Sequence, residues 1–193
     1  MIAAAIGFIG IAVILCVAAV FGLLGVGQIA LSGADAIERD GLARGKPAPR
    51  WSLADSRGVV RTSPPASQLQ LIVFADHSLK SFPSVVAGLR ELSHRGDVEI
   101  VILTRGRHEG AEALIGQLGL GAVAVLAGSA AIYGRYNVRV MPFAIFVDSA
   151  GLVRASSLVN HDWQIAKLRQ VAEIPLEADE LPGGSSTRIA SAV

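Results

Sequence analysis

The segment Asp76-His77-Ser78 places a carboxylate, an imidazole and a hydroxyl in consecutive positions, and Ser81 follows three residues later. Serine hydrolases use these three groups, but the groups must converge in space beside an oxyanion hole. Neighbouring side chains at the end of a strand point in different directions, so no catalytic triad is expected here. Turn and helix-capping hydrogen bonds are the expected roles of Asp76 and Ser78. His77 is expected to be a solvated loop residue or a contact with a partner.

The remaining histidines do not indicate a metal centre. The four histidines of the chain are widely spaced, and no cysteine lies near any of them. Zinc and copper sites use closely spaced His and Cys ligands, so we expect neither a metal nor another cofactor. The basic segment 104–110 follows a predicted strand, at the position where open α/β sheets bind ligands. A phosphate or carboxylate site there is the alternative to a solvated loop, although no small-molecule substrate is evident from the sequence.

The charge balance excludes a strongly electrostatic partner. The chain of 193 residues carries 17 basic and 16 acidic residues, for a net charge of +1. Its basic residues are scattered and are not interleaved with aromatic ones. Binding to a nucleic acid is therefore not expected.

An apolar run at the start of the chain predicts a membrane anchor. Hydrophobic residues make up 52% of the sequence, and no charged side chain occurs before Asp35. Because about 20 apolar residues span a bilayer as a helix, we predict one transmembrane helix in residues 1–32, with residues 2–31 in lipid. A signal peptide cleaved near Ala34–Ala36 is the alternative. Such a peptide has a basic start and a shorter apolar core, which this run lacks.

The anchor also holds the only cysteine, Cys16, so the rest of the chain has no thiol. Residues 33–45 form a polar linker, residues 46–175 a single domain, and residues 176–193 a tail that we expect to be disordered. Basic residues after the anchor place this domain in the cytoplasm by the positive-inside rule.

Within the domain, apolar runs of strand length alternate with segments of helical periodicity. Leu69–Ala75 and Val98–Thr104 are nearly continuous apolar runs, typical of strands that are covered on both faces. A helix is predicted between them from about Phe82, with Ser81 as its N-cap, Pro83 in its first turn and an end at Gly96. Two short strands precede this unit, and a helix, a strand, a short helix, a β-hairpin and a final helix follow it. The order predicts an α/β domain with a mixed sheet and helices on both sides.

Four stretches in this order resemble a known family. They are GKPAPRWSLADSRGVVRTS, LIVFADHSLKSFP, VRVMPFAIFVDSAGLVR and RASSLVNHDWQIAKL, which together span residues 45–173. They are similar to membrane-anchored thioredoxin-like proteins of the TlpA-like redoxin family, and most of all to the MauD-type accessory proteins of methylamine dehydrogenase. The resemblance implies a thioredoxin-like fold, a cis peptide bond at Met141–Pro142, and a domain outside the cytoplasmic membrane. We follow the family on this last point rather than the charge count.

The family has a C-x-x-C motif after the strand that ends near Phe74, and this chain has no cysteine there. One register places Ser78 and Ser81 at the positions of the two sulfurs, and the other places Asp76 and Leu79 there. Neither register supplies a nucleophilic sulfur, so thiol–disulfide chemistry is not expected.

The missing sulfurs therefore favour a non-enzymatic function over an enzymatic one. Together with the resemblance, they predict a single-pass membrane protein whose redox-inactive domain docks a protein partner in a membrane-associated complex, as a docking, assembly or maturation subunit. The expected contact surface is Met141-Pro142-Phe143 with residues 77–82, which include Phe82. Trp51 and Tyr136 are further candidate aromatic anchors. A place in the core, where such rings are more often found, is the alternative for all four aromatic residues. The alternative is a MauD-like accessory factor in disulfide formation and maturation of methylamine dehydrogenase.

Overall fold

The computed structural model describes residues 40–66, 69–105, 109–117, 119–178 and 180–182. The predicted transmembrane helix, the first part of the predicted linker and the end of the tail lie outside these residues. In the described part of the chain, no helix is long and apolar enough to cross a bilayer.

A five-stranded mixed sheet forms the centre of the domain, in the order β5-β4-β3-β6-β7. Strands β3, β4 and β5 are parallel to one another, whereas β6 is antiparallel to both β3 and β7. A separate two-stranded sheet is made by the antiparallel pair β1 and β2. The strands are β1 (Trp51–Ala54), β2 (Val60–Ser63), β3 (Leu69–Phe74), β4 (Val98–Arg105), β5 (Ala124–Gly128), β6 (Phe143–Val147) and β7 (Val153–Leu158).

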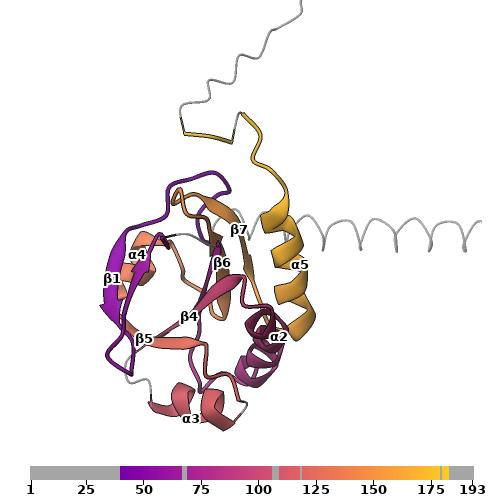
Figure 1. Ribbon diagram of the computed structural model, residues 1–193. Coiled ribbons are helices and arrows are strands. Elements are labelled where there is room, and N and C mark those ends of the chain that lie inside the picture. The colour runs from indigo at the N-terminus through magenta and orange to yellow at the C-terminus, as the bar shows by residue number, and fades with distance from the viewer. Residues whose placement is uncertain (1–39, 67–68, 106–108, 118, 179, 183–193) are drawn as a thin grey trace, which may run out of the picture. The chain divides into compact units, whose positions relative to one another are not determined.

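Helices cover both faces of the sheet, which confirms the predicted α/β class (Figure 1). Helices α2 and α5 pack together on one face, and α4 lies on the other face near the β1–β2 hairpin. Helix α3 connects β4 to β5. The helices are α2 (Phe82–Arg95), α3 (Glu109–Gln117), α4 (Ala130–Arg135) and α5 (Asp162–Glu173).

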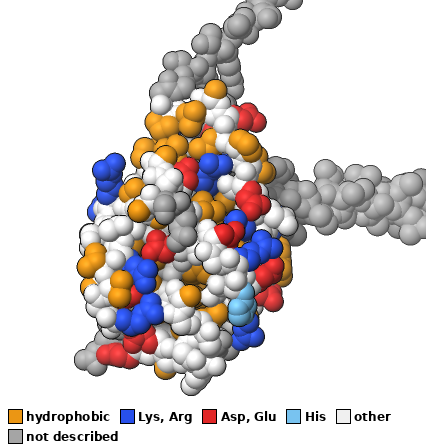
Figure 2. Space-filling view, in the orientation of Figure 1, with side chains coloured by type: hydrophobic (Ala, Val, Ile, Leu, Met, Phe, Trp, Pro, Cys, Tyr) orange, Lys and Arg blue, Asp and Glu red, His pale blue; other side chains and the backbone are white. Residues whose placement is uncertain are grey.

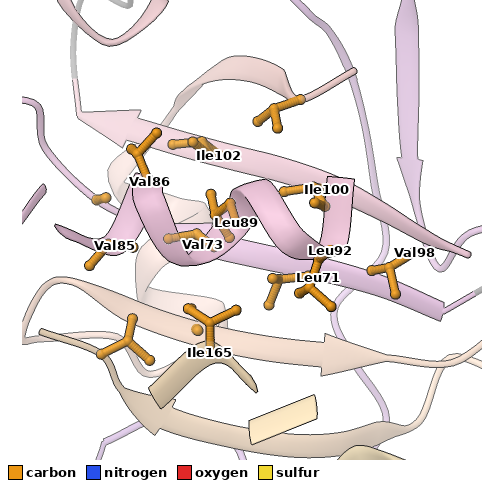
Figure 3. Close-up of a cluster of buried hydrophobic side chains, with 14 of the residues drawn as sticks. Leu71, Val73, Val85, Val86, Leu89, Leu92, Val98, Ile100, Ile102 and Ile165 are labelled. Atoms are coloured by element: carbon orange, nitrogen blue, oxygen red, sulfur yellow. The ribbon is translucent and has the colours of Figure 1, made fainter. Parts of the chain in front are cut away.

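Strand β3 is buried on both sides because successive side chains point to opposite faces of the sheet. Leu71 and Val73 lie in the cluster beneath α2 and α5, whereas Ile72 and Phe74 lie in the cluster beneath α4. Figure 3 shows α2 lying across the sheet in the first cluster. The inward-facing residues of α2 are those predicted from the helical period: Val85, Val86, Leu89 and Leu92, all buried.

The second cluster contains two tyrosines. Tyr133 lies in α4, and Tyr136 is the residue that caps the C-terminal end of this helix. The Phe74 ring lies 5.1 Å from the Tyr133 ring and 5.2 Å from the Tyr136 ring. The Tyr136 hydroxyl accepts a hydrogen bond from Trp51 Nε1 at 3.1 Å and donates one to the Pro49 carbonyl at 3.1 Å. Trp51 and Tyr136 are both buried, so they join the hairpin to the core, the alternative to a role as partner anchors.

Helices α2 and α5 approach each other closely at Gly88. A Cβ atom at this position would lie 2.6 Å from the carbonyl oxygen of Asp162, the first residue of α5. This distance is too short for any side chain, so the packing of the two helices requires glycine here.

The folded unit is longer than the predicted domain 46–175. Gly45 N–H donates to the Val153 carbonyl at 2.8 Å, and Ser156 Oγ donates to the Leu42 carbonyl at 3.0 Å. Arg44 forms an ion pair with Glu180 at 3.5 Å. Gly45 and Leu42 of the predicted linker therefore hydrogen-bond to β7, and Glu180 of the predicted tail contacts Arg44.

Candidate functional site

The parallel strands β3, β4 and β5 end at one edge of the sheet, and β6 begins there. Phe74, the last residue of β3, pairs with Leu103 on one side and with Phe143 on the other. The segment after β3 therefore lies beside the segment before β6. We call this region, made of residues 75–81, Arg105 and residues 139–142, the site edge.

Asp76 organises the turn that follows β3. Its Oδ1 accepts hydrogen bonds from the backbone N–H of Ser78 at 2.9 Å and from Ser78 Oγ at 2.8 Å. The Asp76 carbonyl accepts from Leu79 N–H at 3.1 Å. Asp76 and Ser78 thus make turn hydrogen bonds, as their residue types favour.

Ser81 occupies the N-cap position of α2, as predicted, but its side chain does not cap the helix. It has helical backbone angles, φ −79° and ψ −13°, and its side chain makes no capping hydrogen bond. The helix is entered instead through the Asp76 turn, since Phe82 N–H donates to the Leu79 carbonyl at 3.0 Å and Val85 N–H to the Ser81 carbonyl at 3.1 Å. The first turn contains Pro83, and Gly96 ends the helix in a left-handed conformation with φ 69°, both as predicted.

The electrostatics of the turn do not activate Ser78. The two hydrogen bonds from Ser78 hold the pKa of Asp76 below its ordinary value, and the positive charge of Arg105 acts in the same direction. A carboxylate with a lowered pKa is a poor general base. The imidazole of His77 lies with Nδ1 3.6 Å from Asp76 Oδ1 and does not stand between the carboxylate and the hydroxyl. The three groups therefore do not form a hydrolase triad.

Two further side chains complete this edge: Arg105, which belongs to the basic segment 104–110, and Tyr133, which the sequence analysis did not single out. The Arg105 guanidinium lies 4.9 Å from the centre of the Tyr133 ring, a cation–π arrangement. Tyr133 donates its hydroxyl to the Leu103 carbonyl at 2.8 Å, and burial raises its pKa, so the phenol stays protonated. The sequence contained one signal for the helix that carries Tyr133. Ser129 is an N-cap residue, and its hydroxyl accepts a hydrogen bond from Ile132 N–H at the start of α4. Of the basic segment 104–110, residues 106–108 lie outside the described residues.

The loop before β6 contains a cis peptide bond between Met141 and Pro142, which is what the resemblance implies. Pro142 is buried and its carbonyl accepts from Val159 N–H at 3.0 Å, while Met141 is half-buried against the core. Phe143 and Phe82 are completely buried. Of the two roles considered for these rings, the structure shows the core position, because their places in β6 and α2 face the core.

The exposed part of this loop lies just before the cis bond. Val140 is 48% exposed, and the Arg139 side chain is 72% exposed with Asp40 at 4.0 Å. Across the edge, His77 and Lys80 are also exposed. The accessible surface of the site edge is thus polar, with one aliphatic side chain.

Solved structures with similar folds identify the fold to which this site edge belongs. One is the thioredoxin domain of a thiol-disulfide oxidoreductase from Bacteroides vulgatus, with a TM-score of 0.52 and 17% identity, covering 65% of this chain and 97% of that one. Another is StoA from Bacillus subtilis, with a TM-score of 0.52 and 12% identity over 65% of this chain and 98% of that one. A third is a secreted Mycobacterium tuberculosis disulfide oxidoreductase, with a TM-score of 0.52 and 13% identity over 62% and 95%. This chain has a thioredoxin-like fold. No protein-family model and no curated protein matches its sequence.

In this thioredoxin-like domain the turn between β3 and α2 contains no cysteine. Ser78 is exposed and Ser81 is half-buried, and these are the sulfur positions in one register of the resemblance. Asp76 and Leu79, the positions in the other register, are half-buried, and Leu79 packs against the core beneath α2. Either register places oxygen or carbon where a redoxin would carry sulfur.

Proposed function

We propose that the chain is a membrane-tethered, redox-inactive thioredoxin-like protein that acts as a docking, assembly or maturation subunit of a membrane or extracytoplasmic protein complex. The observation that carries the proposal is the Asp76 turn, in which a carboxylate and a hydroxyl hydrogen-bond to each other where redoxins have thiols. The core beneath the turn is fully apolar and buried, with Leu71, Val73 and Phe82 inaccessible to solvent. The domain therefore keeps a defined surface without needing a disulfide.

The absence of cysteine from the turn supports a role without redox catalysis. Thiol–disulfide exchange needs one thiolate to attack and a second thiol to resolve the mixed disulfide. Helix N-termini and neighbouring cations lower a cysteine pKa from about 8.5 to about 3.5–7.5. A helix dipole contributes at most about 2 kcal/mol, or roughly 1.5 pKa units. That shift does not ionise a serine hydroxyl, and Ser78 already donates its proton to Asp76.

The loop 139–141 offers a surface for docking. Neither the N–H nor the carbonyl of Val140 or Met141 takes part in a backbone hydrogen bond with another described residue. An extended segment of a partner can add its own backbone to such groups, and neighbouring side chains then select the partner. Arg139, Val140 and Lys80 are the exposed side chains placed to do so.

An exchange assay on the full-length chain tests the redox part of the proposal. We expect the chain, purified in detergent in a Cys16→Ser background, to reduce insulin disulfides no faster than buffer containing the same dithiol. The double variants Ser78→Cys/Ser81→Cys and Asp76→Cys/Leu79→Cys, in the same background, are the matched positive controls. We expect one of the two to accelerate the reaction. Activity of the cysteine-free chain above the buffer rate would overturn the proposal.

A photocrosslinking experiment in native cells tests the docking part. A photoreactive amino acid at Lys80 or Val140 is expected to give a discrete protein adduct. The same amino acid at Ser149, in the exposed turn between β6 and β7 at the far end of the sheet, is the control and is expected to give none. Equal labelling at all three positions would contradict docking at the site edge.

A further inference from the structure

One aromatic side chain in the first turn of α5 is exposed. Trp163 is 57% exposed, whereas every other Phe, Tyr and Trp among the described residues is buried. Tryptophan carries a large apolar area and is among the residues that contribute most to protein–protein binding. The core of the domain does not use this ring, so its exposure calls for another explanation.

Trp163 lies beside the site edge. Strand β7 ends next to the loop that precedes β6, since Val159 N–H donates to the Pro142 carbonyl at 3.0 Å. Helix α5 begins soon afterwards, and the backbone of its first residue, Asp162, packs against Gly88 of α2. Trp163 is the next residue of the chain, so it lies near both the cis-proline loop and α2.

A neighbouring side chain holds the indole ring. The rings of His161 and Trp163 are nearly parallel, with an angle of 8° between them and 6.4 Å between their centres. Ala166, one turn further along the same side of α5, is exposed and has only a methyl group that could cover the ring. A side chain that is already held loses less rotamer freedom when a partner binds. The ring therefore offers a preorganised and accessible apolar contact.

The basic side chains near this ring have no partner. Lys167 lies one turn after Trp163 in α5, and Lys80 lies just before α2. Both are exposed, and neither forms an ion pair with another described residue. Asp162, in contrast, accepts the backbone N–H of Trp163 at 2.8 Å.

The acidic side chains between α2 and α5 are already paired within the domain. Glu91 pairs with Arg95 at 3.5 Å. Arg169 pairs with both Asp97 at 2.9 Å and Glu173 at 3.0 Å. On the right of Figure 2, where these two helices lie, basic and acidic side chains accordingly lie next to one another. The unpaired charges near the indole ring are therefore those of the two lysines.

We infer that Trp163 anchors the docked partner, and that the partner segment presents an apolar side chain flanked by Asp or Glu residues. The inference rests on the docking role of the proposed function and adds the anchor and the chemistry of the partner. The apolar side chain packs on the indole ring, and the acidic side chains pair with Lys80 and Lys167. A basic segment would bring like charges together, which opposes binding.

A library of short random peptides displayed on phage tests the chemistry of the partner. The library is selected against the full-length chain in detergent, after counter-selection on empty micelles. We expect the enriched peptides to contain an aromatic or aliphatic residue between acidic residues. Enrichment of basic peptides, or of peptides without a common sequence, would overturn the inference.

Substitutions test the place of the anchor with an enriched peptide as the ligand. Trp163→Ala should weaken binding about 30-fold, the loss typical of a hot-spot residue. Lys167→Glu should weaken binding about threefold to tenfold at low salt, and less at high salt. Lys46→Glu is the matched control, because Lys46 is an exposed lysine whose backbone pairs with the start of β7, at the other end of the sheet. Unchanged binding to Trp163→Ala, or equal losses in the two lysine variants, would overturn the inference.

The contact can also be observed directly, because the chain has only two tryptophans. Trp51→Phe leaves the exposed Trp163 as the single indole, and Trp163→Phe leaves the buried Trp51. An enriched peptide is expected to shift the emission of Trp163 to shorter wavelength and to protect it from acrylamide, without an effect on Trp51. A response from Trp51 alone would contradict the contact.

Photocrosslinking in native cells separates this inference from the proposed function. A photoreactive amino acid at Ala166 should give the same protein adduct as at Lys80 and Val140. Adducts at Lys80 and Val140 without one at Ala166 would overturn the anchor and leave the docking role standing. An adduct of Ala166 with lipid or with a second copy of the chain would overturn the anchor as well. Absence of an adduct at all three positions would contradict the docking role itself, and the inference with it.

Discussion

The two ends of the central sheet treat their polar residues differently. At the site edge, Asp76 is bound to Ser78 two residues away, within one exposed turn. At the opposite end, Asp55 follows β1 with its side chain completely buried, and it forms ion pairs with Arg57 at 3.2 Å and Arg61 at 3.4 Å. One carboxylate belongs to an exposed turn, whereas the other lies buried in the β1–β2 hairpin and binds Arg61, which also contacts Glu99 in β4.

The network around Asp55 extends to the first residues of β3 and β4. Arg61 pairs with Glu99 at 3.5 Å, and Gln70 Nε2 donates to Glu99 at 2.9 Å and to the Thr62 carbonyl at 2.8 Å. These contacts fasten the β1–β2 hairpin to β3 and β4. We conclude that the polar residues at the far end contribute to the stability of the fold, whereas those at the site edge can be substituted with little loss of stability.

The largest effect is expected for Asp55→Ala. The substitution removes the acceptor of the Val59 and Arg57 backbone N–H groups and both ion pairs, so it should lower the free energy of unfolding by about 3 kcal/mol. Thermal or denaturant unfolding of the full chain in detergent, followed by tryptophan fluorescence, measures this change. A loss below about 0.5 kcal/mol would remove the basis of the comparison.

An intermediate effect is expected at Gly88, which lies between the two ends. Gly88→Ala places a methyl group against the Asp162 backbone and should cost about 1–3 kcal/mol of stability. Gly116→Ala in α3 is the matched control, because open space surrounds that position. It should be neutral or stabilising by up to about 1 kcal/mol, since alanine is the better helix former. Equal losses in both variants would mean that the close helix contact is not what requires Gly88.

A smaller effect is expected for Asp76→Ala at the site edge. Loss of the two hydrogen bonds from Ser78 in an exposed turn should cost about 1 kcal/mol or less. The same unfolding measurement applies. If this variant lost as much stability as Asp55→Ala, the two ends of the sheet would not differ as described.

Acid should reduce the contribution of Asp55. Burial alone would raise its pKa, but the hydrogen bonds from Val59 and Arg57 outweigh burial and hold the folded-state pKa below the ordinary value of 3.8. A lowered folded-state pKa means that the stabilisation is complete above the unfolded-state pKa and is lost as the pH falls through the folded-state pKa. The stability difference between the wild type and Asp55→Asn should therefore be largest above about pH 5 and shrink below about pH 4. A difference that does not vary with pH would contradict this assignment.

Sequence patterns located the elements with strong apolar signals. The predicted strands 69–75 and 98–104 agree with β3 and β4 to within one residue, because short apolar runs rich in Val and Ile are typical of strands that are buried on both faces of a sheet. The same burial decides between the two roles considered for Phe82 and Phe143. Both were possible partner contacts or core residues, and each begins an element whose first residue already faces the core.

Long-range contacts were beyond the reach of the sequence patterns. The segment 40–45 has no strand-like alternation, and its partners in β7 lie more than 100 residues away in the chain. The absence of a capping hydrogen bond from the Ser81 side chain has a local cause, since Asp76 forms the turn that leads into α2. The Arg105–Tyr133 contact likewise depends on how β4 and α4 meet, which neither segment specifies alone.

The contacts of Arg44 have a practical consequence for anyone who fuses a reporter to this protein. Arg44 donates to the carbonyls of Ile174 and Pro175 and pairs with Glu180, and a side chain at Gly45 would collide with the Glu180 backbone. A topology reporter joined directly after Pro175 would replace Glu180. The segment around Arg44 and Gly45, which pairs with β7, would then lose one of its contacts. The fusion point should instead follow Val193, so that the compartment of the domain is read without disturbing how the domain is held.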